Sequence, residues 1–220
     1  MAIERTNIIY SSDAAQAAAN LYNYLNTNAV PTYFDRIEIN DAVVSCYVGE
    51  VELLKFSMFL NSSGNGVTVT TENGETITFT ASGNSAQFQY AYKCNNGISF
   101  ALDLAADIVL TITKDNSGNT AVIFVSSSSG SYLSMSKNST SGYNKLYVVN
   151  KKSQSIFYKF FYCLNRGEQA TILCPLSVGD TLNYTPNAFL MPYTQYTAQG
   201  VIDIDGCKYI SNGLWCVKDE

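Results

Sequence analysis

Histidine is missing from the 220-residue sequence. Its absence removes the commonest general base, the Ser-His and Cys-His pairs of nucleophilic catalysis, and the commonest zinc ligand. Charged residues are also scarce, at 14% against roughly 25% in an average soluble protein. The net charge of −5 argues against electrostatic binding to the phosphate backbone of nucleic acid. We therefore predict a protein that is not an enzyme, uses no metal or other cofactor, and does not bind nucleic acid.

Long apolar runs are missing as well. No run approaches the roughly 18 residues that a membrane span needs. The first residues, MAIERTNIIYSSDAAQ, lack a basic segment followed by an apolar one, so no signal peptide is expected. The six cysteines form no CxxC pair, which in a reducing compartment is typical of small buried hydrophobes. Disulfides stay open as an alternative outside the cell.

Ser, Thr, Asn, Gly and Tyr are abundant instead, with 16 tyrosines in the chain. A surface built from these residues is polar but uncharged. Such a surface is typical of secreted, cell-surface and virion β proteins more than of cytosolic enzymes.

One helix is expected near the N-terminus. Ser12 or Asp13 can cap its first turn, and Pro31 follows its end. Ala14, Ala18, Leu21 and Leu25 fall on one stripe. Because no heptads continue this stripe, we expect it to pack on a sheet rather than in a coiled coil.

After the helix the hydrophobic period changes from 3.6 to 2, which predicts antiparallel strands. Asn73 and Gly74 between two alternating runs predict a β-hairpin with a type I′ turn. A second hairpin is expected through residues 115–119. The predicted fold is mainly β, with sandwich-like antiparallel sheets and one N-terminal helix.

A serine-rich segment, residues 126–142, interrupts the alternation. This composition buries little area, so it predicts a long loop or a linker. We place a boundary there, between an N-terminal helix and β domain at residues 1–125 and a C-terminal β domain at residues 143–220.

The last twenty residues are the most strongly patterned. Turns at Asp205-Gly206 and Asn212-Gly213 predict a three-stranded meander over residues 201–217, with Ile202 and Ile204 on one face of its first strand. The meander either closes the sheet of the second domain or pairs with another subunit. Its candidate assembly residues are Tyr209, Leu214, Trp215 and Val217.

Two acidic residues, Asp203 and Asp205, share a strand face and could form a carboxylate pair of the glycosidase kind. A half-buried strand with its acids toward solvent and a turn at Asp205-Gly206 explains them better. Residues 115–119 resemble a fragment of a calcium loop but lack the full ligand series, and a hairpin turn explains them.

A run of polar and aromatic residues, QFQYAYK, is the candidate binding platform. It places Gln87, Gln89, Tyr90 and Tyr92 close together. Exposed tyrosine suits either a sugar or a protein interface, and the pattern does not separate a glycan platform from an oligomer contact.

Several longer stretches resemble one group of proteins. The run from Ala14 to Phe59, YKCNNGISFALDL, VLTITKDNSGNTAVIF and the ending GVIDIDGCKYISNGLWCVKDE together resemble virion-associated, tail-module proteins of phages and prophages of gut Firmicutes. The shared features are a helix, an F-D-x-I-E strand, a T-K-D-x-x-G-N-T hairpin and a terminal G-x-x-Y-x-S-x-G-x-W-x-x-K-D segment.

The resemblance implies a non-enzymatic structural protein that acts through protein-protein interfaces, as a homo-oligomer or with other virion proteins. It implies synthesis in the cytoplasm of a bacterial host and exposure outside the cell after lysis. The alternative is a carbohydrate- or cell-surface receptor-binding module, either on the same virion or as a free adhesin.

Overall fold

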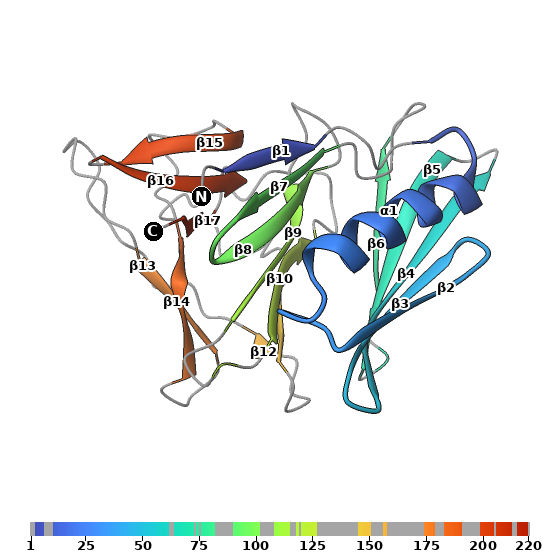
Figure 1. Cartoon of the computed structure of the whole chain (residues 1–220), viewed down its shortest axis with the longest axis horizontal. Coiled ribbons are helices and arrows are strands. Elements are labelled where there is room, and N and C mark those ends of the chain that lie inside the picture. The colour runs from blue at the N-terminus through green and yellow to red at the C-terminus, as the bar shows by residue number, and fades with distance from the viewer. Residues whose placement is uncertain are drawn as a thin grey trace.

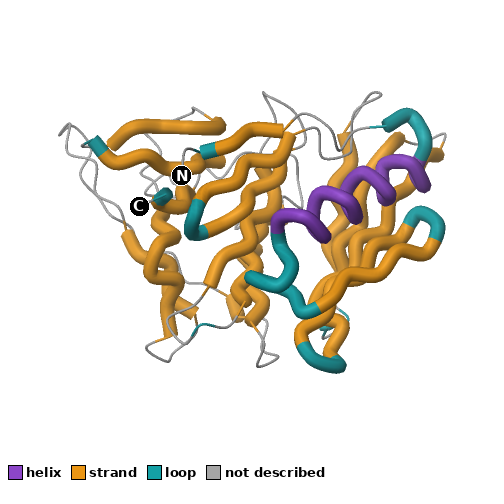
Figure 2. Tube along the Cα trace, viewed as in Figure 1, coloured by secondary structure: helices purple, strands orange, loops and turns teal. Residues whose placement is uncertain are grey.

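The structure is a computed structural model of the whole chain. It describes residues 3–6, 11–61, 64–72, 74, 76–81, 90–101, 108–114, 118, 120–126, 145–150, 156–157, 174–178, 183–190, 199–204, 206–212 and 215–219. Strands make up most of these ranges, as Figure 2 shows in orange. They form three antiparallel sheets, and the described ranges contain a single helix near the N-terminus. The mainly β fold with antiparallel sheets and an N-terminal helix is thereby confirmed.

Helix α1, Ala14–Asn28, begins where the sequence indicates. Asp13 is its N-cap, and its carboxylate accepts the Gln16 N–H at 2.7 Å. The helix buries Ala17, Ala18, Leu21 and Leu25 against β2, β3 and β4. The expected stripe therefore packs on a sheet, and Figure 1 shows α1 lying across that sheet.

The sheet beneath α1 has the strand order β2-β3-β4-β5-β6. Each strand pairs with its neighbour in sequence, so the sheet is an antiparallel meander. The bounds are β2 Arg36–Asn40, β3 Val43–Val48, β4 Val51–Asn61, β5 Gly64–Thr71 and β6 Thr76–Ala81.

A second sheet, in the middle of Figure 1, has the order β1-β7-β8-β9-β10-β11-β12. Its first strand, β1, comes from the N-terminus and pairs with β7. The helix and all strands of the first sheet lie between β1 and β7 in the sequence. The bounds are β1 Glu4–Thr6, β7 Tyr90–Cys94, β8 Gly97–Ala101, β9 Ile108–Lys114, β10 Thr120–Ser126, β11 Lys145–Asn150 and β12 Ile156–Phe157.

The third sheet has the order β13-β14-β17-β16-β15 and contacts the second sheet through β14 and β16. Its bounds are β13 Cys174–Val178, β14 Asn183–Leu190, β15 Gln199–Ile204, β16 Cys207–Asn212 and β17 Trp215–Lys218. The expected terminal meander is present as β15, β16 and β17. Its last strand lies between β14 and β16, so the meander completes this sheet.

One hydrophobic core joins the helix, the first sheet and the second sheet. Leu21 and Leu25 of α1, Phe56 of β4 and Phe100 of β8 are fully buried in it. The rings of Tyr24 and Phe100 meet edge to face, with centroids 5.8 Å apart. This core fixes the end of α1 over β7 and β8, where the candidate site lies.

The turn between β5 and β6 differs from the expected type I′ turn. The register pairs Thr70 with Thr76, which leaves an odd number of residues in the loop. The Gly74 N–H donates to the Thr71 carbonyl at 2.9 Å, and Gly74 has a φ of 76°. This bond joins Thr71 to Gly74, whereas a two-residue turn at residues 73 and 74 would join residues 72 and 75. Asn73 lies outside the described residues. The hairpin was predicted, and glycine supplies the positive φ in its loop.

The first of the two terminal turns follows the pattern. Ile204 pairs with Cys207, so residues 205 and 206 form the expected two-residue turn, and the Asp203 carboxylate accepts the Gly206 N–H at 3.0 Å. The second expected turn lies at residues 212 and 213, and the structure has Asn212 as the last residue of β16 and Trp215 as the first of β17, with residues 213 and 214 between them. Those two residues lie outside the described ranges.

The serine-rich segment, residues 126–142, lies outside the described ranges except for Ser126. The strands on either side of it, β10 and β11, pair along six residues each. The second sheet therefore takes strands from both predicted blocks, and the division into two domains stays a prediction.

Limited proteolysis tests that division. We expect the first cuts within residues 126–142, because a serine-rich composition gains little free energy from burial and proteases prefer segments of small polar residues. The fragments should be mapped by mass spectrometry. First cuts within residues 66–81 would contradict the predicted boundary.

Candidate functional site

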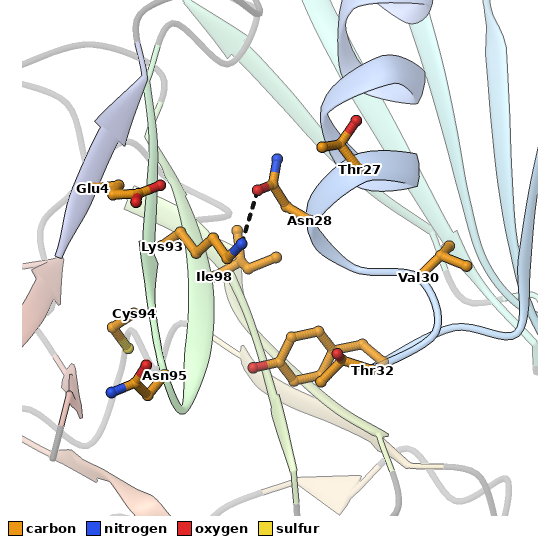
Figure 3. A pocket seen from close by; sticks show the side chains of 10 residues that line it. Glu4, Thr27, Asn28, Val30, Thr32, Lys93, Cys94, Asn95 and Ile98 are labelled. Carbon is orange, nitrogen blue, oxygen red and sulfur yellow. Dashed lines mark hydrogen bonds between the residues drawn. The ribbon is translucent and has the colours of Figure 1, made fainter. Parts of the chain in front are cut away.

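A cavity of about 240 Å³ lies between the end of α1 and the β7–β8 hairpin. Figure 3 shows side chains from both sides of it. They come from β1, from α1 and the segment that follows it, from β7 and from β8. The lining residues are Glu4, Thr27, Asn28, Val30, Thr32, Tyr33, Lys93, Cys94, Asn95 and Ile98.

Lys93 and Asn28 join the two walls of the cavity. Lys93 Nζ donates to Asn28 Oδ1 at 3.0 Å, as the dashed line in Figure 3 shows. The amide nitrogen of Asn28 donates to the Tyr24 carbonyl at 2.9 Å, one turn back in α1. The helix therefore fixes the orientation of the amide, and its oxygen is directed at the lysine.

The floor of the cavity is more apolar. Tyr33 is buried, and burial raises its pKa above the ordinary range, with a further rise from the neighbouring Cys94. Burial also raises the pKa of Cys94 to about 11. Both groups are therefore neutral at physiological pH, with the phenol able to donate or accept a hydrogen bond.

The chain's C-terminal residues hold the β7–β8 turn in place beside this cavity. The Asp219 carboxylate accepts the Asn95 N–H at 2.9 Å. The side-chain amide of Asn96 donates to the carbonyls of Lys218 and Asp219 at 2.7 and 2.9 Å. Asp219 is itself anchored to β16, because its N–H donates to the Lys208 carbonyl at 2.9 Å. We call this contact between Asn95, Asn96, Lys218 and Asp219 the terminal clasp.

Gly97, the first residue of β8, permits the third sheet to approach this closely. A Cβ atom at this position would lie 2.9 Å from the Ile112 carbonyl oxygen and 3.1 Å from Val217 Cγ1. The first distance is shorter than real Cβ contacts, and the atom it meets is backbone. The backbone of β9 therefore requires glycine here, and a Cβ atom would also be tight against the Val217 side chain of β17.

Three of the four candidate assembly residues, Tyr209, Trp215 and Val217, belong to β16 and β17. Tyr209 is buried on one face with Ile202, Ile204 and Cys216. Val217 is buried on the other face, toward Gly97. Leu214 and the side chain of Trp215 lie outside the described part of the chain. Tyr209 and Val217 thus serve in packing within the chain, and the assembly role of the segment stays a prediction.

The candidate binding platform is described in part only. Gln87 and Gln89 lie outside the described residues, and Tyr90 is described by its backbone in β7. Tyr92 is 3% exposed, with the Arg5 guanidinium carbon 5.9 Å from its ring centroid. Its ring is therefore not offered to solvent, and the platform as a whole stays a prediction.

Asp203 is explained by the β15–β16 turn. The Asp203 side chain is exposed and accepts the Gly206 N–H, which is the turn role expected for it. Asp205 lies outside the described ranges. Within those ranges no group of three or more Cys, Asp or Glu side chains is placed to hold a metal ion.

Comparison of this chain with protein-family models, curated proteins and solved structures found no match. In the described ranges, α1 is neither long nor apolar enough to cross a membrane, and no other helix occurs there.

Sequence reasoning missed the residues that line the cavity. Asn28 and Lys93 lie 65 positions apart, so no local pattern could bring them together. For Asp219 a weak signal was present, because Lys218 and Asp219 end the terminal segment that resembles tail-module proteins. The sequence around Asn95 and Asn96 indicates a turn, but it does not indicate a contact with the C-terminal residues.

Cysteine accessibility offers a test of the packing around the site. Cys46, Cys94, Cys207 and Cys216 are free thiols, and Cys207 is the least buried of these four. Burial raises the pKa of Cys94 to about 11 and of Cys216 to about 12, so at pH 8 about one in a thousand Cys94 side chains is a thiolate. We expect iodoacetamide to modify Cys207 well before Cys94 or Cys216, as measured by peptide mass spectrometry. Equal modification of these three would contradict the described packing.

Proposed function

We propose that the protein is a non-enzymatic structural protein of a phage virion, associated with the tail, and that it acts through protein-protein interfaces as a homo-oligomer. Three antiparallel sheets with many strand edges and an uncharged polar composition suit such a role. The resemblance of the helix, the hairpins and the terminal segment to tail-module proteins supports it.

The edge of the third sheet is the observation that carries the proposal. Among the described strands, β15 has a partner on one side only, β16. Figure 1 shows it at the margin of the molecule. It bears an exposed apolar side chain, Val201, at 48% exposure. Natural edge strands are commonly protected by charge, but the one acidic residue within β15, Asp203, is engaged in the adjacent turn.

A second copy of this chain fits that edge. Antiparallel pairing of two β15 strands about Val201 sets the two valines opposite each other and each Asp203 opposite a neutral residue, Gln199. Like charges therefore never meet across the pair, which removes a common cost of strand pairing. A contact of this kind uses the same patch on both copies and closes as a twofold dimer.

The mass of the full chain in solution tests the interface. We expect about 48 kDa by size-exclusion chromatography with light scattering, twice the 24.1 kDa of one chain. Genes for tail, baseplate or lysis proteins beside the coding sequence would support the virion assignment. A monomer at every concentration tested would contradict the homo-oligomer.

A carbohydrate- or receptor-binding module is the second candidate. The cavity beside α1 favours it, because amide, hydroxyl and ammonium groups line that cavity together with apolar side chains. Such a module could belong to the same virion protein, so the two roles are compatible.

A further inference from the structure

The cavity between α1 and the β7–β8 hairpin offers hydrogen-bond donors and acceptors that have spare capacity among the described residues. Lys93 carries three N–H donors, and one of them is bonded to Asn28. The other two have no partner within the described residues. The Thr27 and Thr32 hydroxyls also line the cavity, and each can both donate and accept a hydrogen bond.

Charge in the lining is balanced. The Lys93 ammonium supplies one positive charge and the Glu4 carboxylate, on β1, supplies one negative charge. Figure 3 shows both side chains on the same side of the cavity, with Lys93 reaching toward Asn28. An anion drawn to Lys93 would also approach the carboxylate of Glu4, and a cation would approach Lys93. The lining therefore favours a neutral ligand that makes many hydrogen bonds.

The size of the cavity and the apolar part of its lining further limit the class of ligand that can bind. Pockets for drug-sized molecules measure roughly 300–1,000 Å³. A cavity of about 240 Å³ is just smaller than these, which suits a ligand of one ring. Half-buried Val30 and the small accessible part of Tyr33 provide apolar surface against which the C–H groups of a sugar ring can pack.

We propose that this cavity binds a neutral sugar through one ring, with Lys93 donating to a ring hydroxyl and Thr32 completing the contact. The site is distinct from the β15 edge, and of the QFQYAYK run only its last residue, Lys93, lines the cavity. It does not rest on the proposed assembly, because a monomer would hold the same cavity.

Titration of the full chain with neutral monosaccharides tests the proposal. The panel is glucose, galactose, mannose and N-acetylglucosamine, with glucuronate and inorganic phosphate as charged competitors. Binding is measured by ligand-observed NMR and calorimetry. We expect at least one neutral sugar to bind, and Lys93→Met to weaken it about tenfold, because a hydrogen bond from a charged donor is lost. Thr32→Val should weaken it about two- to tenfold, as for a neutral hydrogen bond.

Lys208→Met is the matched control, because Lys208 is an exposed lysine on β16, outside the cavity lining. It should leave the affinity unchanged. Should Lys93→Met fail to fold, Thr32→Val still tests the proposal, because Thr32 is exposed and its substitution should not disturb folding. The proposal is overturned if no neutral sugar binds at 20 mM, if phosphate or glucuronate binds in preference, or if the cavity variants bind as the control does.

Discussion

Removal of residues 201–220 should leave the protein insoluble or without a cooperative unfolding transition. The deletion takes away most of β15 and all of β16 and β17, which leaves β14 paired with β13 alone. It also removes the buried side chains of Ile202, Ile204, Ile210 and Val217. Burial of each contributes about 1.5–3 kcal/mol, so together they are comparable to the about 5–15 kcal/mol that stabilises a whole domain.

Circular dichroism during heating and the soluble fraction after expression measure this effect. The full-length chain is the reference. A truncated protein that stays soluble, melts at the same temperature and keeps its mass in solution would show that the terminal strands contribute nothing to the fold.

Substitution Asp219→Ala should lower the free energy of unfolding by about 1.5–3 kcal/mol, the usual range for a hydrogen bond to a charged group. Asp219 is 6% exposed, and its carboxylate accepts the Asn95 N–H across the terminal clasp. The alanine variant leaves that N–H without its acceptor beside the packed β7–β8 turn. Urea unfolding, with the midpoint and the slope fitted separately, measures the loss.

Two further variants show whether the loss of stability comes from the terminal clasp or from the removal of any acidic side chain. Asp219→Asn keeps an acceptor oxygen at the same place, so its loss should be under about 1 kcal/mol. Asp203→Ala removes the same kind of carboxylate-to-backbone bond at an exposed turn, where water replaces it, and should also cost under about 1 kcal/mol. Equal losses for Asp219→Ala and Asp203→Ala would contradict the special role of the clasp.

Local signals in the sequence were enough to predict the helix and most strands. Asp13, the stripe of α1 and Pro31 together specify the helix, because capping and 3.6-residue periodicity act over short distances. Alternation predicted Ile202 and Ile204 on one face of β15, and both are buried while Val201 is exposed. Turn positions were less certain, since a single register shift moves the turn by one residue, as between β5 and β6.

Successive residues Cys216 and Val217 of β17 are both buried, on opposite faces of the strand. A strand with one solvated face alternates, but β17 lies between β14 and β16, and its Val217 face meets the β7–β8 hairpin at Gly97. The cavity and the clasp were missed for a related reason. Both join residues far apart in the chain, and such contacts depend on how the sheets pack rather than on any local pattern.

The mass of two matched valine variants in solution tests the proposed assembly most directly. Val201 on β15 and Val51 on β4 are exposed to similar extents, 48% and 45%. Lysine at an edge strand opposes strand pairing, so Val201→Lys should reduce the mass from about 48 kDa to the 24.1 kDa of one chain at an unchanged melting temperature. Val51→Lys should keep the mass of the unmodified chain. A Val201→Lys protein with the mass of the unmodified chain, or a loss of mass in both variants, would contradict assembly through the β15 edge.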